Sequence, residues 1–204
     1  MATSLLSLSM TGTLAGFVAS ITNTTNTSSS GSLIMAETYD QSAEAEPQGD
    51  AQAASTCVST EGQVSTTNSA ECTSIDMFGG NSEMIPGNPV VTNIRIHNTG
   101  TLTPSSFTLT PAGSCMASEV LADQHGSGVE SMCDVVSVEI RSGDVELFSG
   151  PISELAAQGP LEIPTLPAAG DSVPFTITTV LAENVGNDYQ GLGVSLPLTW
   201  AFAS

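Results

Sequence analysis

The sequence predicts an all-β protein, a sandwich of two sheets, and three observations support this. The chain is 40% hydrophobic but only 4% aromatic and 11% charged, and Ser, Thr, Gly, Ala and Val dominate it. That mixture favours pleated strands joined by small-residue turns. Apolar or alternating runs recur between Gly and Pro residues. A length of 204 residues is enough to bury one core, so one sandwich domain is expected.

The runs between these breakers give the predicted strands in order. They cover residues 32–36, 90–97, 106–110, 135–140, 145–148, 173–181 and 193–202. Turns are predicted at pairs such as Gly143-Asp144 and Gly170-Asp171. With one N-terminal strand added, these elements suit an eight-stranded or nine-stranded sandwich. No long amphipathic helix is visible, although residues 116–123 suit a helix of one or two turns.

The N-terminal segment, residues 1–22, is an apolar stretch with a period of two. Its apolar residues alternate with small polar ones, and two glycines stand in the same series: Leu6, Leu8, Met10, Gly12, Leu14, Gly16 and Val18. Period two indicates a strand with one buried face. A helical stripe can also be drawn through the segment, but its Ser, Thr and Gly content favours the strand. It resembles a signal peptide without a basic start, and it is too short and too polar for a stable membrane span.

A polar linker and an acidic stretch follow. Residues 23–32 are almost entirely Thr, Asn, Ser and Gly, with glycosylation sequons at Asn23 and Asn26. After the first predicted sandwich strand, residues 37–80 are acidic and poor in large apolar side chains, which predicts a solvated insertion. The predicted organisation is therefore a donor strand and linker over residues 1–30 and a sandwich over residues 31–204.

The four cysteines, Cys57, Cys72, Cys115 and Cys133, have no CxxC spacing. An even number in a chain with exported character indicates two disulfides, for which three connectivities exist. We favour the two local pairs, Cys57 with Cys72 and Cys115 with Cys133. Each would stabilise the fold by roughly 3 kcal/mol through loop closure.

The charge balance excludes several partners. Twenty-one acidic residues face two basic ones, Arg95 and Arg141, for a formal net charge of -19. Without lysine or a basic stripe, the chain is a poor ligand for nucleic acid or for anionic membranes. A polymer of this chain cannot use lysine isopeptide bonds, so it must be held non-covalently or through cysteine.

No catalytic or metal site is predicted. His97 and His125 lack a partner histidine at metal-ligand spacing, and neither HExxH nor GxSxG occurs. Calcium is the ion that the acidic turns suit best, at Asp123 and at a cluster of Glu183, Asn184, Asn187 and Asp188. Neither place has the spacing of a calcium loop, so solvated turns and no cofactor are expected.

Three stretches together resemble the family of TasA, camelysin and related exported fibre-forming proteins. They are residues 11–35, with a Gly-Thr-x-Ala-x-Phe junction, residues 90–109, with a strand and an Asn-x-Gly-Thr-Leu turn, and residues 175–203, with Asn187, Tyr189, Gln190 and Gly191 before the last strand. The resemblance implies a jelly-roll-like sandwich, export through a dedicated signal peptidase, and fibres in which an N-terminal strand complements the next subunit. It also implies a cut near Ala15, which would leave residues 17–21 as the donor. The acidic insertion, the four cysteines and the lack of a basic leader depart from the family pattern.

The function expected from the sequence is a structural subunit of an extracellular filament, with the chain itself as its partner. An alternative is a monomeric surface adhesin or binding module with the same sandwich. The least favoured interpretation is an exported metalloprotease, because camelysin carries that classification and the motif is missing here.

Overall fold

The computed structural model describes residues 28–39, 56–60, 68–79, 83–121 and 125–204. By its contacts the chain divides between Ser30 and Gly31, and the unit Gly31–Ser204 contains every strand and helix described. The predicted donor strand, with its apolar residues and glycines from Leu6 to Val18, lies outside the described residues. So do both sequons, Asn23 and Asn26.

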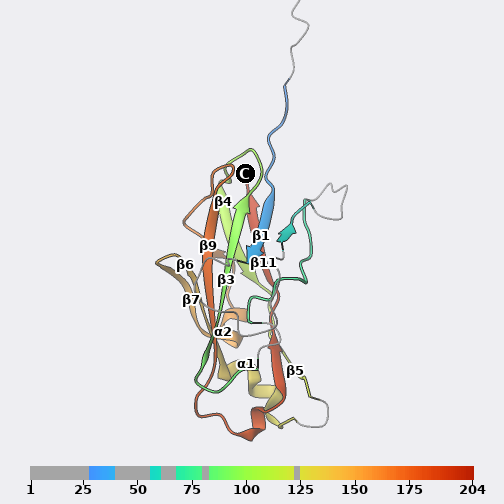
Figure 1. The fold of residues 1–204 in the computed structure, drawn as a ribbon, viewed down its shortest axis with the longest axis vertical. Coiled ribbons are helices and arrows are strands. Elements are labelled where there is room, and N and C mark those ends of the chain that lie inside the picture. The colour runs from blue at the N-terminus through green and yellow to red at the C-terminus, as the bar shows by residue number, and fades with distance from the viewer. Residues whose placement is uncertain (1–27, 40–55, 61–67, 80–82, 122–124) are drawn as a thin grey trace, which may run out of the picture. The chain divides into compact units, whose positions relative to one another are not determined.

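The unit is an all-β sandwich, as predicted (Figure 1). Its larger layer is an antiparallel six-stranded sheet in the order β2-β1-β3-β9-β6-β7. The strands are β1 (Met35–Tyr39), β2 (Thr56–Val58), β3 (Pro89–Asn98), β6 (Val136–Ser142), β7 (Val145–Pro151) and β9 (Ser172–Leu181). The central strands β3 and β9 alternate buried and half-exposed side chains, the pattern of a sheet with one face on the core.

The second layer is built from two smaller sheets. One has three strands, β11 (Leu198–Ala203), β4 (Ser106–Pro111) and β8 (Leu161–Glu162), and the other pairs β10 (Leu192–Ser195) with β5 (Met116–Glu119). The Ala112 N–H donates to the Pro197 carbonyl oxygen at 2.8 Å between the two sheets. The layer is thus one long antiparallel pair, β4–β5 beside β10–β11, with β8 added at one edge.

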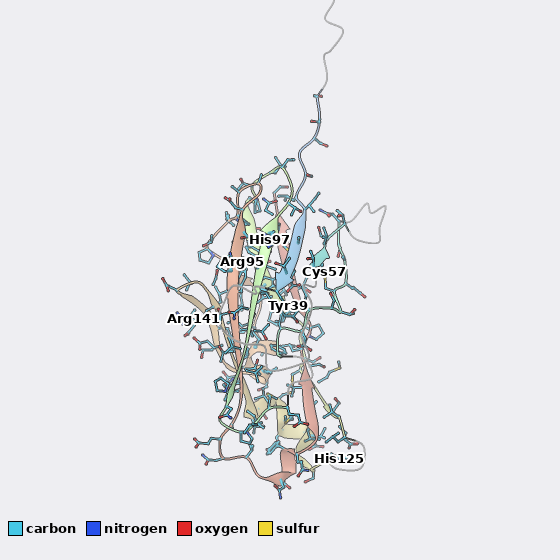
Figure 2. All side chains as sticks on the ribbon, in the orientation of Figure 1. Tyr39, Cys57, Arg95, His97, His125 and Arg141 are labelled. Carbon is cyan, nitrogen blue, oxygen red and sulfur yellow. A yellow bond between two sulfur atoms is a disulfide. The ribbon has the colours of Figure 1, made fainter. Side chains whose placement is uncertain are left out.

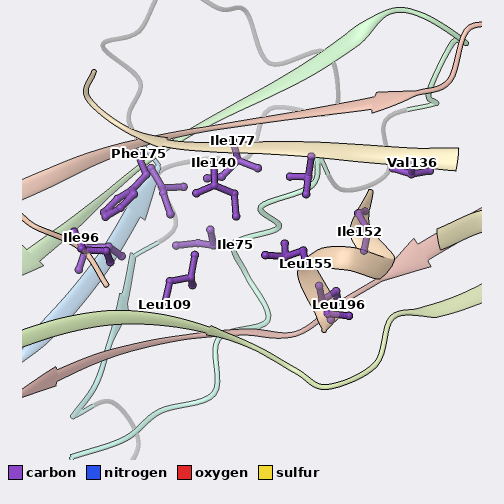
Figure 3. Close-up of a cluster of buried hydrophobic side chains, with 14 of the residues drawn as sticks. Ile75, Ile96, Leu109, Val136, Ile140, Ile152, Leu155, Phe175, Ile177 and Leu196 are labelled. Carbon is purple, nitrogen blue, oxygen red and sulfur yellow. The ribbon is translucent and has the colours of Figure 1, made fainter. Parts of the chain in front are cut away.

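The core lies between the two layers (Figure 3). Phe175 of β9 meets Phe107 of β4 edge to face, with ring centroids 5.9 Å apart, and both rings are fully buried. Ile75, from the predicted insertion, is buried among these side chains as well. Burying a large apolar side chain contributes about 1.5–3 kcal/mol, so this shared core is what holds the layers together.

Several predicted boundaries were wrong. The run 193–202 is two strands in different sheets, because Pro197 has no N–H for a continuous ladder. Residues 116–119 form β5 rather than a helical turn, since they pair with β10 along their whole length. The acidic stretch 37–80 is not all loop: its first residues complete β1, and β2 lies within it.

Short helices were also missed. Val135 ends the four-residue helix α1 (Met132–Val135), which follows the 3₁₀ helix η1 (Gly128–Ser131) and precedes β6. Helix α2 (Ile152–Ala156) begins directly after Pro151, and η2 (Asn187–Tyr189) precedes β10. Two predicted turns are confirmed by left-handed glycines, Gly143 with φ of 56° and Gly170 with φ of 86°. The jelly-roll connectivity stays a prediction.

Candidate functional site

The edges of the sheets are the places where a strand from another copy can add, because their backbone groups lack a neighbour. The six-stranded sheet ends in β2, which has three residues, and in β7. Strand β7 carries several features that discourage pairing: a bulge in its register opposite Arg141, the charged Glu146, and Pro151 at its end. Neither edge of the larger sheet is a good template.

Strand β11 is a different kind of edge. It pairs with β4 over six residues, and within the described part of the chain no strand lies on its other side. Its sequence, Leu-Thr-Trp-Ala-Phe-Ala, contains no charge, proline or glycine. The residues Leu198, Trp200 and Phe202 are only half-buried although they pack against the core. An uncharged apolar edge of this length is the kind that natural proteins protect or use.

The backbone of β11 also favours an added strand. The hydrogen bond from the Ala112 N–H to the Pro197 oxygen shows which residues point their backbone groups toward the partner strand in the β4–β11 ladder: Pro197 and every second residue after it. The alternate residues that follow, Leu198, Trp200 and Phe202, therefore direct their own N–H and C=O groups away from β4. No strand among the described residues pairs with these outward groups, and the side chains of the same three residues pack against the core.

An aromatic cluster supports this edge from beneath. The ring of Trp200 lies 4.5 Å from that of Phe175 and 5.8 Å from that of Phe107, measured between centroids. Phe202 is also 4.7 Å from Phe107. Phe107 and Phe175 are fully buried, so the half-buried rings of β11 pack on side chains of the core.

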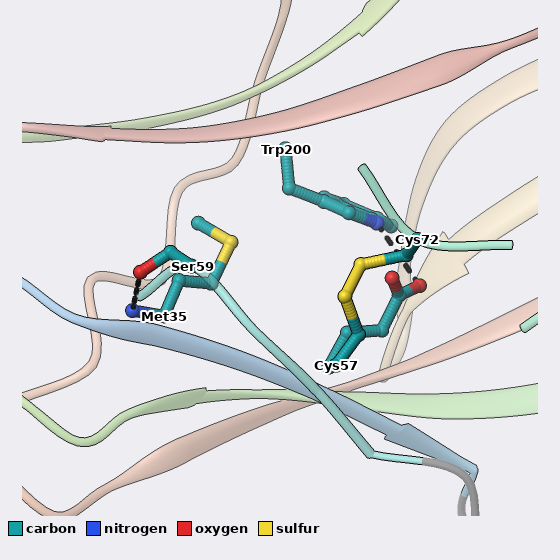
Figure 4. The surroundings of a disulfide bond; sticks show 6 residues. Met35, Cys57, Ser59, Cys72 and Trp200 are labelled. Atoms are coloured by element: carbon teal, nitrogen blue, oxygen red, sulfur yellow. Dashed lines mark hydrogen bonds between the residues drawn. A yellow bond between two sulfur atoms is a disulfide. The ribbon is translucent and has the colours of Figure 1, made fainter. Parts of the chain in front are cut away.

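A buried carboxyl joins β1 to β11 (Figure 4). The Trp200 Nε1–H donates to Glu37 Oε1 at 3.3 Å, and Glu37 is 7% exposed. Burial raises the pKa of Glu37 to about 7, and the hydrogen bond from Trp200 offsets part of that rise. A carboxyl that titrates near neutrality therefore lies between the last strand of the smaller sheet and the larger sheet.

Both disulfides join the pairs that the sequence favoured, Cys57 with Cys72 and Cys115 with Cys133. The first lies beside Glu37, since Glu37 and Cys57 are register partners in β1 and β2. It holds the segment 68–79 against the sandwich, where the Asp76 N–H also donates to the Tyr39 hydroxyl at 2.7 Å. Among the described residues, no backbone hydrogen bond joins this segment to β11.

The two histidines do not form one site. His97 lies near the end of β3, where its Nε2 is 3.0 Å from Thr38 Oγ1, and His125 is 3.3 Å from Glu119 near β5. Figure 2 shows them at distant places on the sandwich. Of the predicted calcium residues, Glu183, Asn184, Asn187 and Asp188 are exposed, and Asp123 lies outside the described residues. Within the described ranges, no three His, Cys, Asp or Glu side chains gather at metal-binding distances.

No family model matches the chain, and no curated protein sequence matches it either. In the part of the chain that the structure describes, no helix is long and apolar enough to cross a membrane.

Sequence reasoning missed Glu37 and the role of Trp200. Glu37 stands in a run of acidic and small residues that predicts a solvated loop. The available signal was the alternation Met35, Glu37, Tyr39, whose flanking members pack against the core. That alternation places the carboxyl on the inward face of a strand.

Proposed function

We propose that this chain is the structural subunit of an extracellular filament, in which residues 6–18 of one copy add as a strand to the β-sandwich of the next. The observation that carries the proposal is β11, an uncharged apolar edge with half-buried side chains and outward backbone groups. The N-terminal segment has the matching property, because its apolar residues repeat with a period of two.

The sheets of the two layers differ in their number of strands, so the smaller one can accept an added strand. A six-stranded sheet faces a sheet of three strands that ends in β11. A strand laid beside β11 would pair with the outward groups of Leu198, Trp200 and Phe202 and would cover their exposed sides. Five buried apolar side chains would contribute about 1.5–3 kcal/mol each before the cost of ordering the segment.

Strand addition of this kind produces an open polymer. The donating segment and the accepting edge are different surfaces, so the contact is head-to-tail and repeats without closing. Two disulfides are typical of proteins in oxidising compartments, which supports an extracellular location. The resemblance to exported fibre-forming proteins also implies strand donation, but with a cut near Ala15 that would leave residues 17–21 as the donor; N-terminal sequencing of exported material distinguishes the two donors.

The test compares the full-length chain with a chain lacking residues 1–22, by negative-stain microscopy and size-exclusion chromatography. Filaments are expected from the first and monomers from the second. A matched control replaces Leu6, Leu8, Met10, Leu14 and Val18 by Ser, which keeps the length but removes the apolar face. Filaments from the truncated or the serine-substituted chain would exclude strand donation, and a monomeric full-length chain would favour the adhesin alternative.

A further inference from the structure

We propose that consecutive copies also touch end to end, with an apolar surface at β5 of one copy seating the tip of the next copy's sandwich. This inference rests on the proposed function, because it names a second contact of the same filament. The β5 surface consists of Met116, Val120 and Leu121. The tip consists of Leu102 and Leu166.

The β5 surface is apolar, exposed and well anchored. Its three side chains are 59%, 63% and 51% exposed in the order Met116, Val120, Leu121. The N–H groups of Val120 and Leu121 both donate to the Gly191 carbonyl oxygen, at 2.9 and 3.2 Å. The disulfide at Cys115 fixes the chain just before β5. Single exposed apolar side chains are common, but three within one short segment of chain mark that segment as a candidate contact surface.

The tip is formed by two loops that a buried amide holds together. The Asn98 side chain is fully buried, and its Nδ2 donates to the carbonyl oxygens of Leu102, at 2.7 Å, and Pro167, at 3.0 Å. Leu102 and Leu166, on these loops, are 43% and 39% exposed. The satisfied amide therefore fixes two apolar side chains at one end of the sandwich.

The two surfaces lie at opposite ends of the second layer. The Ser105 N–H donates to the Ala203 oxygen at the tip end, and the Val120 N–H donates to the Gly191 oxygen at the other. Strands β4 and β5 accordingly occupy different ends of the sandwich in Figure 1. Because the surfaces differ and lie at opposite ends, a contact between them propagates along one axis.

The place where the chain enters the sandwich indicates that the partner is a second copy. The Ser32 oxygen accepts hydrogen bonds from the N–H groups of Thr101 and Leu102, at 2.8 and 3.1 Å. The Leu102 side chain packs so closely on Gly31 that a Cβ there would overlap it. The chain therefore enters the sandwich beside the tip. With the tip seated on the β5 end of the next copy, the donor would approach that copy from its β5 end.

This arrangement also fixes the direction of the added strand. Entering from the β5 end, the donor would place its C-terminal residues beside Leu198 and its N-terminal residues beside Ala203. Such a strand is antiparallel to β11, as is every paired strand in the described sheets. Placing Leu8 beside Trp200 would keep both apolar faces toward the core, and in that register exposed Ala201 would lie near Ser7 and exposed Ser195 near Thr13.

The first experiment measures filament formation by V120E, by L102K, and by an equimolar mixture of the two full-length variants, with V145E on the β6–β7 hairpin as the control. V120E alone should lose filaments, because it sets a carboxylate against an apolar tip in an acidic chain. The mixture should regain them, since the carboxylate of a V120E copy can then meet the ammonium group of an L102K copy. V145E should assemble as the unchanged chain does. L102K alone should also lose filaments, because it sets an ammonium group against the apolar β5 surface. A misfolded variant could not be rescued by mixing, so filaments formed only by the mixture report the contact itself.

Further readouts separate this inference from strand donation. The chain lacking residues 1–22 should still associate weakly at high concentration in sedimentation experiments, and V120E should abolish that association. Oxidation of mixed S7C and A201C chains should join two copies, whereas S7C with S195C should not.

If V120E forms filaments normally while the truncated chain forms none, the end contact is wrong and strand donation survives. If the full-length chain forms no filaments and the truncated chain shows no association that V120E removes, both are wrong.

Discussion

The indole of Trp200 donates a hydrogen bond to the buried carboxyl of Glu37, and this contact joins edge strand β11 of the smaller sheet to the larger sheet. The contact lies beside the Cys57–Cys72 disulfide, so this hydrogen bond, the disulfide and the pairing of β1 with β2 meet at one place. Burial opposes ionisation of the carboxyl, and the single hydrogen bond compensates only part of that cost. This place is therefore sensitive to pH and adjoins the proposed acceptor edge.

The stability of the sandwich should fall as the pH rises through the range from 4.5 to about 7. The folded state raises the pKa of Glu37 from 4.5 to about 7, so it binds this proton more tightly than the unfolded state does. The stabilisation is complete below pH 4.5 and is lost above the folded pKa. The loss at pH 8 amounts to about 3 kcal/mol at most. Urea unfolding of the truncated chain at pH 5 and pH 8 measures it.

The variant E37Q isolates this effect. Glutamine keeps an oxygen for the Trp200 N–H but cannot ionise, so E37Q should exceed the unchanged chain in stability at pH 8 and differ little at pH 5. The exposed Glu183, changed to Gln, is the control and should keep the original pH dependence. Equal pH dependence of E37Q and the unchanged chain would show that folding does not raise the pKa of Glu37.

Trp200 should report strand addition directly, because it is the only tryptophan in the sequence. A synthetic peptide of residues 1–22 added to the chain lacking those residues should shift Trp200 emission to shorter wavelength and reduce its quenching by acrylamide. The cause is the added strand, which would remove the half-buried indole from water. A peptide with Ser in place of its five alternating apolar residues should leave the emission unchanged. Binding of the original peptide without any change at Trp200 would place the acceptor elsewhere.

The sandwich could be predicted from the sequence because its central strands carry their own signal. The alternation in residues 90–97 and 173–181 survives in β3 and β9, whose inward faces are buried. Strand β5 could not be predicted, since four residues of mixed polarity become a strand only through pairing with β10. Glu37 was missed for a related reason: its burial depends on Trp200, which is far away in the sequence. Local patterns thus predict the core strands, while the edge and its carboxyl depend on tertiary packing.

Loss of the Cys57–Cys72 disulfide should weaken the sandwich near the proposed acceptor edge. The loop spans 15 residues, and C57A/C72A should cost roughly 3 kcal/mol of unfolding free energy on the chain-entropy estimate. The pair C115A/C133A closes a similar loop of 18 residues at the β5 end and serves as the comparison. Trp200 quenching by acrylamide should rise in the first variant only, because only that disulfide lies beside Glu37 and Trp200. Equal quenching in both variants would contradict a local effect.

Filament growth should accelerate with salt. Each copy carries a formal net charge of -19, so contacts between copies work against repulsion. The screening length falls from about 10 Å at 0.1 M salt to about 3 Å at 1 M, which removes most of that repulsion while apolar contacts persist. Light scattering at several NaCl concentrations measures the growth rate. Growth that slows with salt would mean that ion pairs, rather than apolar contacts, join the copies.

A charge placed at the inward face of β11 should block polymerisation without unfolding the chain. Leu198 is half-buried at the start of the edge, and a lysine there can bring its ammonium group to water along its apolar stem. The stability cost should stay within the about 0.5–3 kcal/mol of an ordinary substitution. An added strand would trap that charge, so L198K should abolish filaments, in the way that natural edge strands avoid pairing. V145K, on the protected edge strand β7, is the matched control and should polymerise normally. Circular dichroism verifies that both variants are folded. Normal filaments from folded L198K would exclude β11 as the acceptor.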